Sequence, residues 1–172
     1  MRSALIVAGL CLTAIFASAT PRVDGTVTPG EYAHTLSVIY DTATVSWSAD
    51  SSAGLYVAVS APTQGWVGIG LGAVVMDGAH IFMGYVKDGQ SVISEQVGLG
   101  HTHDASPVTW AEASAVSQQA GMTTLEVHVP GSRVPVQDGK VSFIVAFAGK
   151  ADTATFHEDN HDGGYIDLGV GK

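Results

Sequence analysis

The sequence predicts an all-β protein, and three observations support that prediction. Short runs of β-branched, aromatic or alternating residues recur along the chain, and turn signals such as Asp-Gly and Ala-Pro separate them. Their spacing of about 8–12 residues is typical of a β-sandwich or barrel. Beyond residue 19, no segment shows a sustained apolar stripe with the 3.6-residue period of a helix. We therefore expect roughly nine to eleven strands in one domain.

The N-terminal residues have the features of a secretory signal peptide. Arg2 precedes an apolar run, and Ala17-Ser18-Ala19 is a small-residue pattern that suits cleavage near Ala19. The run is too short for a membrane-spanning helix and lacks a charged stop after it. The sequence thus predicts a signal peptide over residues 1–19, a single domain over residues 20–172, and a secreted or periplasmic, extracytoplasmic location.

Cysteine content and charge exclude several classes of function. The single cysteine, Cys11, lies in the predicted signal peptide, so the mature chain has no thiol. Covalent c-type haem, iron–sulfur clusters, thiolate zinc sites and cysteine nucleophiles are therefore excluded, and the core must hold the fold without disulfides. The formal net charge is -9. An acidic surface repels nucleic acid and anionic membranes, so we expect no nucleic-acid partner.

The first half of the domain contains five clear strand patterns. They cover residues 36–40, 44–47, 55–59, 81–87 and 91–97. The third ends at the turn signal Ala61-Pro62-Thr63, and the last two flank Asp88-Gly89, a pair that favours a tight hairpin.

The second half continues the strand pattern. Residues 122–129 alternate apolar and polar side chains with a period of two, which predicts a half-buried strand. Residues 141–148 are apolar on both faces, as in a central strand, and residues 165–168 form a closing strand. Residues 110–120 fit a helix and a strand equally, because alanine and glutamine favour one and Val116 the other.

Glycines at every second position mark residues 65–72 as an unusual strand. Gly68 and Gly70 alternate with apolar residues after Trp66, and no helix pattern follows, so the segment fails the test for a dinucleotide-binding loop. Such glycines remove side chains from one face of a strand. Either a neighbouring sheet packs there closely or a flat, bulky ligand approaches the backbone.

Histidines offer two candidate metal sites. His101 and His103 are two residues apart, so both would point the same way if they lie in a strand. His157 and His161 lie in a polar stretch, residues 156–164, that also holds three carboxylates. This stretch does not have the spacing of a calcium loop. No opposing acid pair or serine elbow is present either, so we find no catalytic constellation and do not expect an enzyme.

Met76 is the last candidate functional residue. It lies in the bend before residues 81–87, where Asp77 and Gly78 already supply the turn chemistry. Methionine is a flexible apolar residue that usually fills gaps in a core. In a bend, the alternative to gap-filling is that Met76 is present for the chemistry of its thioether sulfur.

Four motifs together resemble the DOMON domain family. They are VDGTVTPGEY at residues 23–32, GWVGIG at 65–70, MDGA at 76–79 before an apolar strand, and His157 ahead of GGYIDL at 163–168. The resemblance covers nearly the whole mature chain. It implies an immunoglobulin-like antiparallel β-sandwich, outside the cytoplasm, that binds haem b or a sugar.

The haem-binding members of that family, such as the cytochrome domain of cellobiose dehydrogenase, imply particular roles here. Met76 and His157 would be the two axial ligands of a noncovalent haem b, with His161 as the alternative to His157. Both axial positions would be filled, which favours electron transfer over catalysis. The partner would be a separate redox protein or membrane electron carrier. The haem plane would lie against a further set of residues: Trp66, Gly68, Gly70, Phe82 and Phe156.

Two other functions remain open at this point. A carbohydrate-binding sandwich without haem would use exposed Trp66 or Trp110 and polar loops. A histidine-based copper or zinc carrier would use His101, His103 and the stretch that holds His157 and His161. The absorption spectrum of bound haem distinguishes haem-based electron transfer from both of these functions.

Overall fold

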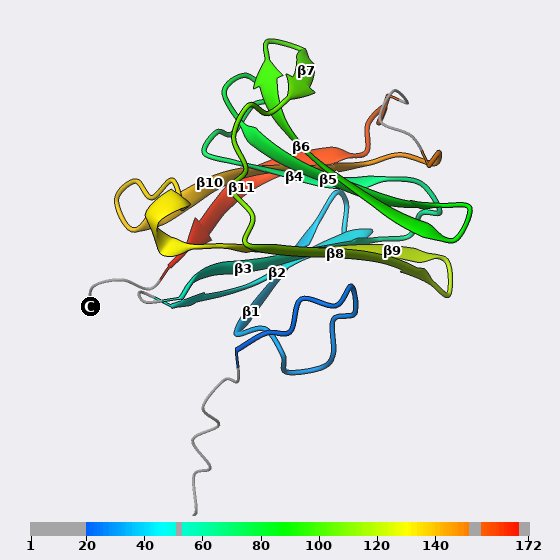
Figure 1. Cartoon of the computed structure of the whole chain (residues 1–172), viewed down its shortest axis with the longest axis horizontal. Coiled ribbons are helices and arrows are strands. Elements are labelled where there is room, and N and C mark those ends of the chain that lie inside the picture. The colour runs from blue at the N-terminus through cyan, green and yellow to red at the C-terminus, as the bar shows by residue number, and fades with distance from the viewer. Residues whose placement is uncertain (1–19, 51–52, 152–155, 169–172) are drawn as a thin grey trace, which may run out of the picture.

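The computed structural model describes residues 20–50, 53–151 and 156–168, which fold into two antiparallel sheets packed face to face (Figure 1). The predicted signal peptide lies outside these residues. The all-β prediction is confirmed, because the described residues form eleven strands and a single 3-10 turn, η1 (Gly131–Arg133). No helix within these ranges is long and apolar enough to cross a membrane.

One sheet has five strands and the other has six. The five-stranded sheet has the order β1 (His34–Val38), β2 (Ala43–Asp50), β3 (Gly54–Ala61), β9 (Met122–Val129) and β8 (Ala113–Gln119). The six-stranded sheet has the order β11 (His161–Asp167), β10 (Lys140–Phe147), β4 (Val67–Leu71), β5 (His80–Lys87), β6 (Gln90–Leu99) and β7 (Thr102–Ala105). Every neighbouring pair is antiparallel, and consecutive strands are mostly joined by hairpins.

The core lies between the sheets and follows the period-two patterns of the sequence. Each strand turns alternate side chains inward, so apolar residues from both sheets meet. The five-stranded sheet contributes Val45, Val57, Val59, Leu125 and Val127. The six-stranded sheet contributes Val67, Ile69, Phe82, Phe143 and Val145. Because both sheets bury one face here, the arrangement is a sandwich rather than a barrel.

The hairpin between β5 and β6 forms where Asp88-Gly89 predicts it. Both residues have positive φ, 51° at Asp88 and 75° at Gly89. Two-residue hairpins of this kind need positive φ at both central positions, which glycine adopts without a steric cost and aspartate tolerates. The turn fixes the register that pairs Val86 with Ser91.

Three strands differ from the sequence analysis or decide between its alternatives. Residues 110–120, which suited helix and strand equally, lead into strand β8. Strand β7 follows a turn in a stretch with loop composition. Strand β11 begins at His161, within the stretch expected to be a loop, because it pairs with β10 along its whole length. In both β7 and β11, pairing with a neighbouring strand overrides weak local propensity.

The N-terminal segment, residues 20–33, lies on the outer face of the five-stranded sheet (Figure 1). Glu126, fully buried on β9, holds it there. Its Oε2 accepts hydrogen bonds from three successive backbone N–H groups, those of Asp24 (2.9 Å), Gly25 (2.6 Å) and Thr26 (3.1 Å). Its Oε1 accepts one from the hydroxyl of Tyr32 at 2.7 Å. A buried carboxylate is tolerated when it is hydrogen-bonded this fully.

Candidate functional site

The candidate site lies on the outer face of the six-stranded sheet, which faces away from the five-stranded sheet. In β4, Val67, Ile69 and Leu71 point into the core between the sheets. Gly68 and Gly70 therefore point outward. The alternating glycines flatten the middle of this outer face, as the sequence pattern predicts.

Three neighbouring side chains lie close to the two glycines. A Cβ at Gly70 would lie 2.8 Å from Cγ1 of Ile144 and 3.0 Å from Cβ of Ala79. A Cβ at Gly68 would lie 3.6 Å from Cζ3 of Trp66. A side chain at Gly70 would therefore displace its neighbours, and a flat ligand on this face needs Trp66 and Ile144 to move aside.

A small apolar cluster, separate from the main core, forms the rest of this face. Trp66, Met83 and Ala148 are buried in it, and Tyr85 and Ala146 pack against them. Only 3% of Met83 is exposed. Met83 therefore packs inside this cluster, which is methionine's ordinary role.

Met76 lies on the same outer face, at the end of the sheet where β4 turns into β5. Its carbonyl accepts the N–H of Ala79 at 3.1 Å, and the N–H of Gly78 donates to the Gly98 carbonyl on β6 at 3.0 Å. The Met76 backbone passes so close above Gly98 that a Cβ there would collide with the Met76 carbonyl oxygen. The half-buried Met76 side chain also lies over Gly98.

His157 lies just before β11 and faces the apolar cluster. Its ring meets Trp66 edge-on, with 6.4 Å between ring centroids. Its Nδ1 hydrogen-bonds the Glu158 carbonyl oxygen at 2.8 Å, which leaves Nε2 as the nitrogen that can bind a metal. Desolvation by burial lowers the pKa of His157, and repulsion from His161 and His103 adds to the shift. The imidazole is thereby kept neutral, the form that binds metal.

His161 stands next to it at the start of β11. Its Cα pairs with Ala146, a member of the apolar cluster, so its side chain projects from the outer face of the sheet. The centroids of the His157 and His161 rings are 4.8 Å apart. Both candidate ligands therefore reach the same region, His161 from a strand and His157 from the bend before it.

The structure brings most of the expected residues together but separates one. Trp66, Gly68, Gly70, Met76 and His157 all lie on the outer face. Phe156 packs beside His157, with 4.6 Å between ring centroids, although 71% of the residue is exposed. Phe82 points the other way, into the core between the sheets, and is fully buried. Its position in β5 places it one residue out of phase with Ile81 and Met83, which do face outward.

A buried polar group that was not among the predicted site residues lies on the inner face of the same sheet. His80, on the inner side of β5, has its Nε2 2.7 Å from Oε2 of Glu95. The same carboxylate accepts the backbone N–H of Trp110, and the Trp110 ring stacks on His80 at 4.1 Å. The alternation of His80 with Phe82 is the signal in the sequence that places His80 inward.

These positions bear on the two other functions. Trp66 is buried and one face of Trp110 is covered by His80, so neither offers an open aromatic platform for a sugar. His101 lies in the turn between β6 and β7, and His103 lies in β7. Among the described residues, no group of three or more histidines, cysteines or carboxylates could hold a metal ion.

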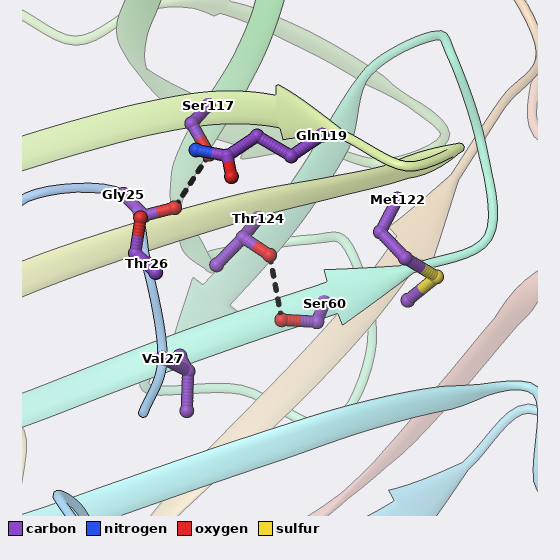
Figure 2. A pocket seen from close by; sticks show the side chains of 8 residues that line it. All are labelled: Gly25, Thr26, Val27, Ser60, Ser117, Gln119, Met122 and Thr124. Carbon is purple, nitrogen blue, oxygen red and sulfur yellow. Dashed lines mark hydrogen bonds between the residues drawn. The ribbon is translucent and has the colours of Figure 1, made fainter. Parts of the chain in front are cut away.

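Two recesses lie elsewhere on the described part of the chain. A small polar recess of ≈ 120 Å³ lies beneath the N-terminal segment on the five-stranded sheet, where Ser117 donates to the Gly25 carbonyl and Ser60 bonds Thr124 (Figure 2). A cleft of ≈ 380 Å³ at one end of the sandwich is lined mainly by apolar and glycine residues, among them Leu55, Val134 and Leu168. Neither recess contains Met76, His157 or His161.

The fold is that of cytochrome b domains. The chain is similar to the cytochrome b domain of pyranose dehydrogenase from Coprinopsis cinerea, with a TM-score of 0.58 and 15% identity over 78% of this chain and 81% of that one. It is also similar to the cytochrome domain of Myriococcum thermophilum cellobiose dehydrogenase, with a TM-score of 0.55 and 12% identity over 73% and 74% of the two chains. No protein-family model and no curated protein matches the sequence. The resemblance stated above is therefore confirmed for the fold.

Proposed function

We propose that this protein binds one noncovalent haem b on the outer face of the six-stranded sheet and transfers electrons. One observation supports this above the others. A thioether and two imidazoles, those of Met76, His157 and His161, belong to the same outer face, whose middle is flattened by glycines and lined by an apolar cluster. Two structures that share this fold are cytochrome domains.

The chain's own residues fit this ligand in three respects. The mature sequence has no cysteine, so any haem is held without a covalent bond. The Glu158 carbonyl orients His157 and the apolar surroundings keep it neutral, as a metal-binding imidazole requires. Gly68 and Gly70 present no side chains on this face, and the side chains nearest to them are those of Trp66, Ile144 and Ala79.

Met76 and one histidine are the proposed axial ligands. The bound group supplies one-electron redox chemistry at its iron. A thioether favours the ferrous form, so pairing Met76 with an imidazole raises the reduction potential relative to two imidazoles. Because both axial positions would be filled from the chain, no open position remains for a substrate, and we infer electron transfer without catalysis.

Export and a separate partner complete the proposal. The signal-peptide pattern of residues 1–19 supports a location outside the cytoplasm. Electrons would pass to or from a separate redox protein or a membrane electron carrier.

Reconstitution with haemin tests the proposal directly. We expect one equivalent to bind, with a Soret band and a low-spin spectrum in both oxidation states, and acidified organic solvent to extract it. If the haem-free protein gives no Soret band after reconstitution, the proposal is wrong. Haem that stays on the chain after extraction would show the noncovalent assignment to be wrong.

A further inference from the structure

Three chain segments surround the outer face of the six-stranded sheet: residues 72–79, 98–105 and 156–165, here called the rim. They are joined to one another. The Gly100 N–H donates to Oδ1 of Asp77 at 2.8 Å, which ties the first two segments. A Cβ at Gly163 would lie 3.5 Å from the Val74 carbonyl, so the first and third are also adjacent.

The rim carries charge of only one sign. It contains five carboxylates and no lysine or arginine: Asp77, Asp104, Glu158, Asp159 and Asp162. Two of them have structural roles, since Asp77 accepts the Gly100 N–H and Asp162 accepts the Ile39 N–H at 3.0 Å. Asp104, Glu158 and Asp159 are exposed. Three exposed charges of one sign with no lysine or arginine among them give the rim a negative potential, which attracts a surface of opposite charge.

The rim also exposes apolar side chains. Of the ten large apolar residues most exposed in the described chain, five belong to it: Val74, Val75, Leu99, Phe156 and Tyr165. Phe156 and Val75 are 71% and 60% exposed. Exposed apolar residues that gather in one place, edged by polar ones, mark a surface that another molecule covers.

The opposite face of the molecule is different. The N-terminal segment already covers part of the outer face of the five-stranded sheet, through Glu126 and the Ser117–Gly25 hydrogen bond (Figure 1). The β6–β7 hairpin rises beside the outer face of the six-stranded sheet (Figure 1). The face that carries the proposed ligands is thus also the face that is both apolar and acidic at its edge.

We propose that the rim is the docking surface for a separate electron-transfer protein that presents a ring of lysines and arginines around an apolar centre. This inference rests on the proposed function for the nature of the partner. Charge complementarity selects the partner. A second copy of this chain would bring five more carboxylates against the first five, and an anionic membrane or nucleic acid would be repelled in the same way. An opposite ring of charge would steer encounter and raise the association rate at low salt.

Two matched triple variants isolate the rim charges. The rim variant carries Asp104→Asn, Glu158→Gln and Asp159→Asn, which removes three exposed charges and leaves Asp77 and Asp162 in place. The control variant carries Asp88→Asn, Asp138→Asn and Glu112→Gln. It removes the same charge from positions outside the rim, and asparagine tolerates the positive φ of Asp88 and Asp138.

The probe for binding is zinc-substituted mitochondrial cytochrome c, a cationic and redox-inactive protein. It is titrated at low ionic strength into the haem-free, ¹⁵N-labelled chain, so this arm does not depend on haem. We expect amide shifts confined to the rim segments. Affinity should fall about tenfold in the rim variant and less than twofold in the control, and binding should be lost at about 0.5 M salt, where charges are screened.

A second arm measures electron transfer from the reduced, haem-loaded chain to native cytochrome c. We expect the second-order rate constant to fall about tenfold in the rim variant alone. If haem does not bind, the proposed function fails, but the titration still tests the docking surface.

Any of three results would overturn the docking proposal. The first is amide shifts spread over all acidic positions, or an equal loss of affinity in the control variant. The second is a chain that dimerises at the concentration used and becomes monomeric in the rim variant, which would assign the rim to a second copy. An acidic plant-type ferredoxin that binds the rim as tightly as cytochrome c would also contradict it.

Discussion

The Met76 carbonyl lies directly against the backbone of Gly98, with no room between them for a side chain. Gly98 belongs to β6 and Met76 to the bend between β4 and β5, so this contact fixes the bend against the sheet. The Gly78 N–H to Gly98 carbonyl bond and the Gly98 N–H to Ala79 carbonyl bond, at 3.0 and 2.9 Å, hold the same contact. The position of the thioether is therefore set by a glycine 22 residues away in the sequence.

Gly98→Ala should displace Met76 without unfolding the protein. The added Cβ would collide with the Met76 backbone and force it to move. The bend can move because most of its residues are exposed. We expect the ferric spectrum after haemin reconstitution to become largely high-spin, while the far-UV circular dichroism stays unchanged. Gly149→Ala is the matched control, because Gly149 has open space around it and no positive φ. A low-spin spectrum in Gly98→Ala would show that Met76 is not a ligand or that the bend adapts.

Replacing each of two methionines separates ligation from packing. Met76→Ala should open one axial position, giving a high-spin ferric spectrum and carbon monoxide binding in the reduced state, with little loss of stability. Met83→Ala should leave the spectrum unchanged but lower the free energy of unfolding by about 2–5 kcal/mol, because Met83 is buried against Trp66 and Ala148. Visible spectra and urea unfolding distinguish the two. The opposite pattern would assign the ligand to Met83.

Strand positions and turns were predictable because they depend on local chemistry. Asp88-Gly89 specifies its hairpin whatever surrounds it, and residues 141–148 are apolar on both faces because β10 is a central strand. The outward direction of Gly68 and Gly70 follows from the same period of two. Each of these features can be worked out from a few neighbouring residues.

The site itself depends on contacts between distant segments, which the sequence pattern does not show. Phe82 was expected beside the ligand, yet register with Ile69 and Glu95 turns it into the core. His161 was expected in a loop, yet pairing with Ala146 makes it the first residue of a strand. The close approach of Gly98 to Met76 had no local signal at all. In each case a long-range pairing decides the outcome.

Glu126 should be the main attachment of the N-terminal segment. Glu126→Gln keeps the shape but replaces a charged acceptor of four hydrogen bonds with a neutral amide. We expect the free energy of unfolding to fall by about 1–3 kcal/mol, and the amide resonances of Asp24, Gly25 and Thr26 to shift. The haem spectrum should not change, because this site is on the other sheet. The exposed Glu112→Gln serves as the control, and equal stability in the two variants would contradict this role.

The same contact predicts a loss of stability in alkali. Burial raises the pKa of Tyr32, and the hydrogen bond to Glu126 raises it further. A raised pKa in the folded state means that the stabilisation is fully present below the unfolded pKa of about 10 and is lost as the pH rises above it. We expect Tyr32→Phe to flatten the dependence of urea midpoint on pH between about 9 and 11. If the wild-type and Tyr32→Phe curves remain parallel over that range, Tyr32 does not contribute in this way.

Acid should act on the haem-free protein through His157. Its pKa is lowered by burial, so between that lowered value and about 6.5 the unfolded chain binds more protons than the folded one. Stability is therefore present above about pH 6.5 and is lost as the pH falls through the folded pKa. The effect is small because the ring is only half buried. His157→Gln should flatten the urea midpoint below about pH 6.5, and an unchanged slope would show that His157 is not responsible.

Replacing each histidine in turn tests which one is the second ligand beside Met76. His157 contacts Trp66, and its Nδ1 bonds the Glu158 carbonyl, which leaves Nε2 as the nitrogen that can bind a metal, while burial lowers the pKa of the ring. His161 projects from a paired strand but is more exposed. We therefore expect His157→Ala to abolish the low-spin spectrum and His161→Ala only to weaken haem binding or shift the potential slightly.

Added imidazole strengthens the comparison, because a small ligand can refill an empty axial position. It should restore a low-spin spectrum in His157→Ala and change nothing in His161→Ala. Each variant is first checked for an unchanged far-UV spectrum, since His161 lies in β11 and its loss could disturb that strand. Loss of the low-spin spectrum in a folded His161→Ala, restored by imidazole, with His157→Ala unaffected, would place the ligand at His161. That result would make the start of β11, rather than the bend before it, the element that holds the iron.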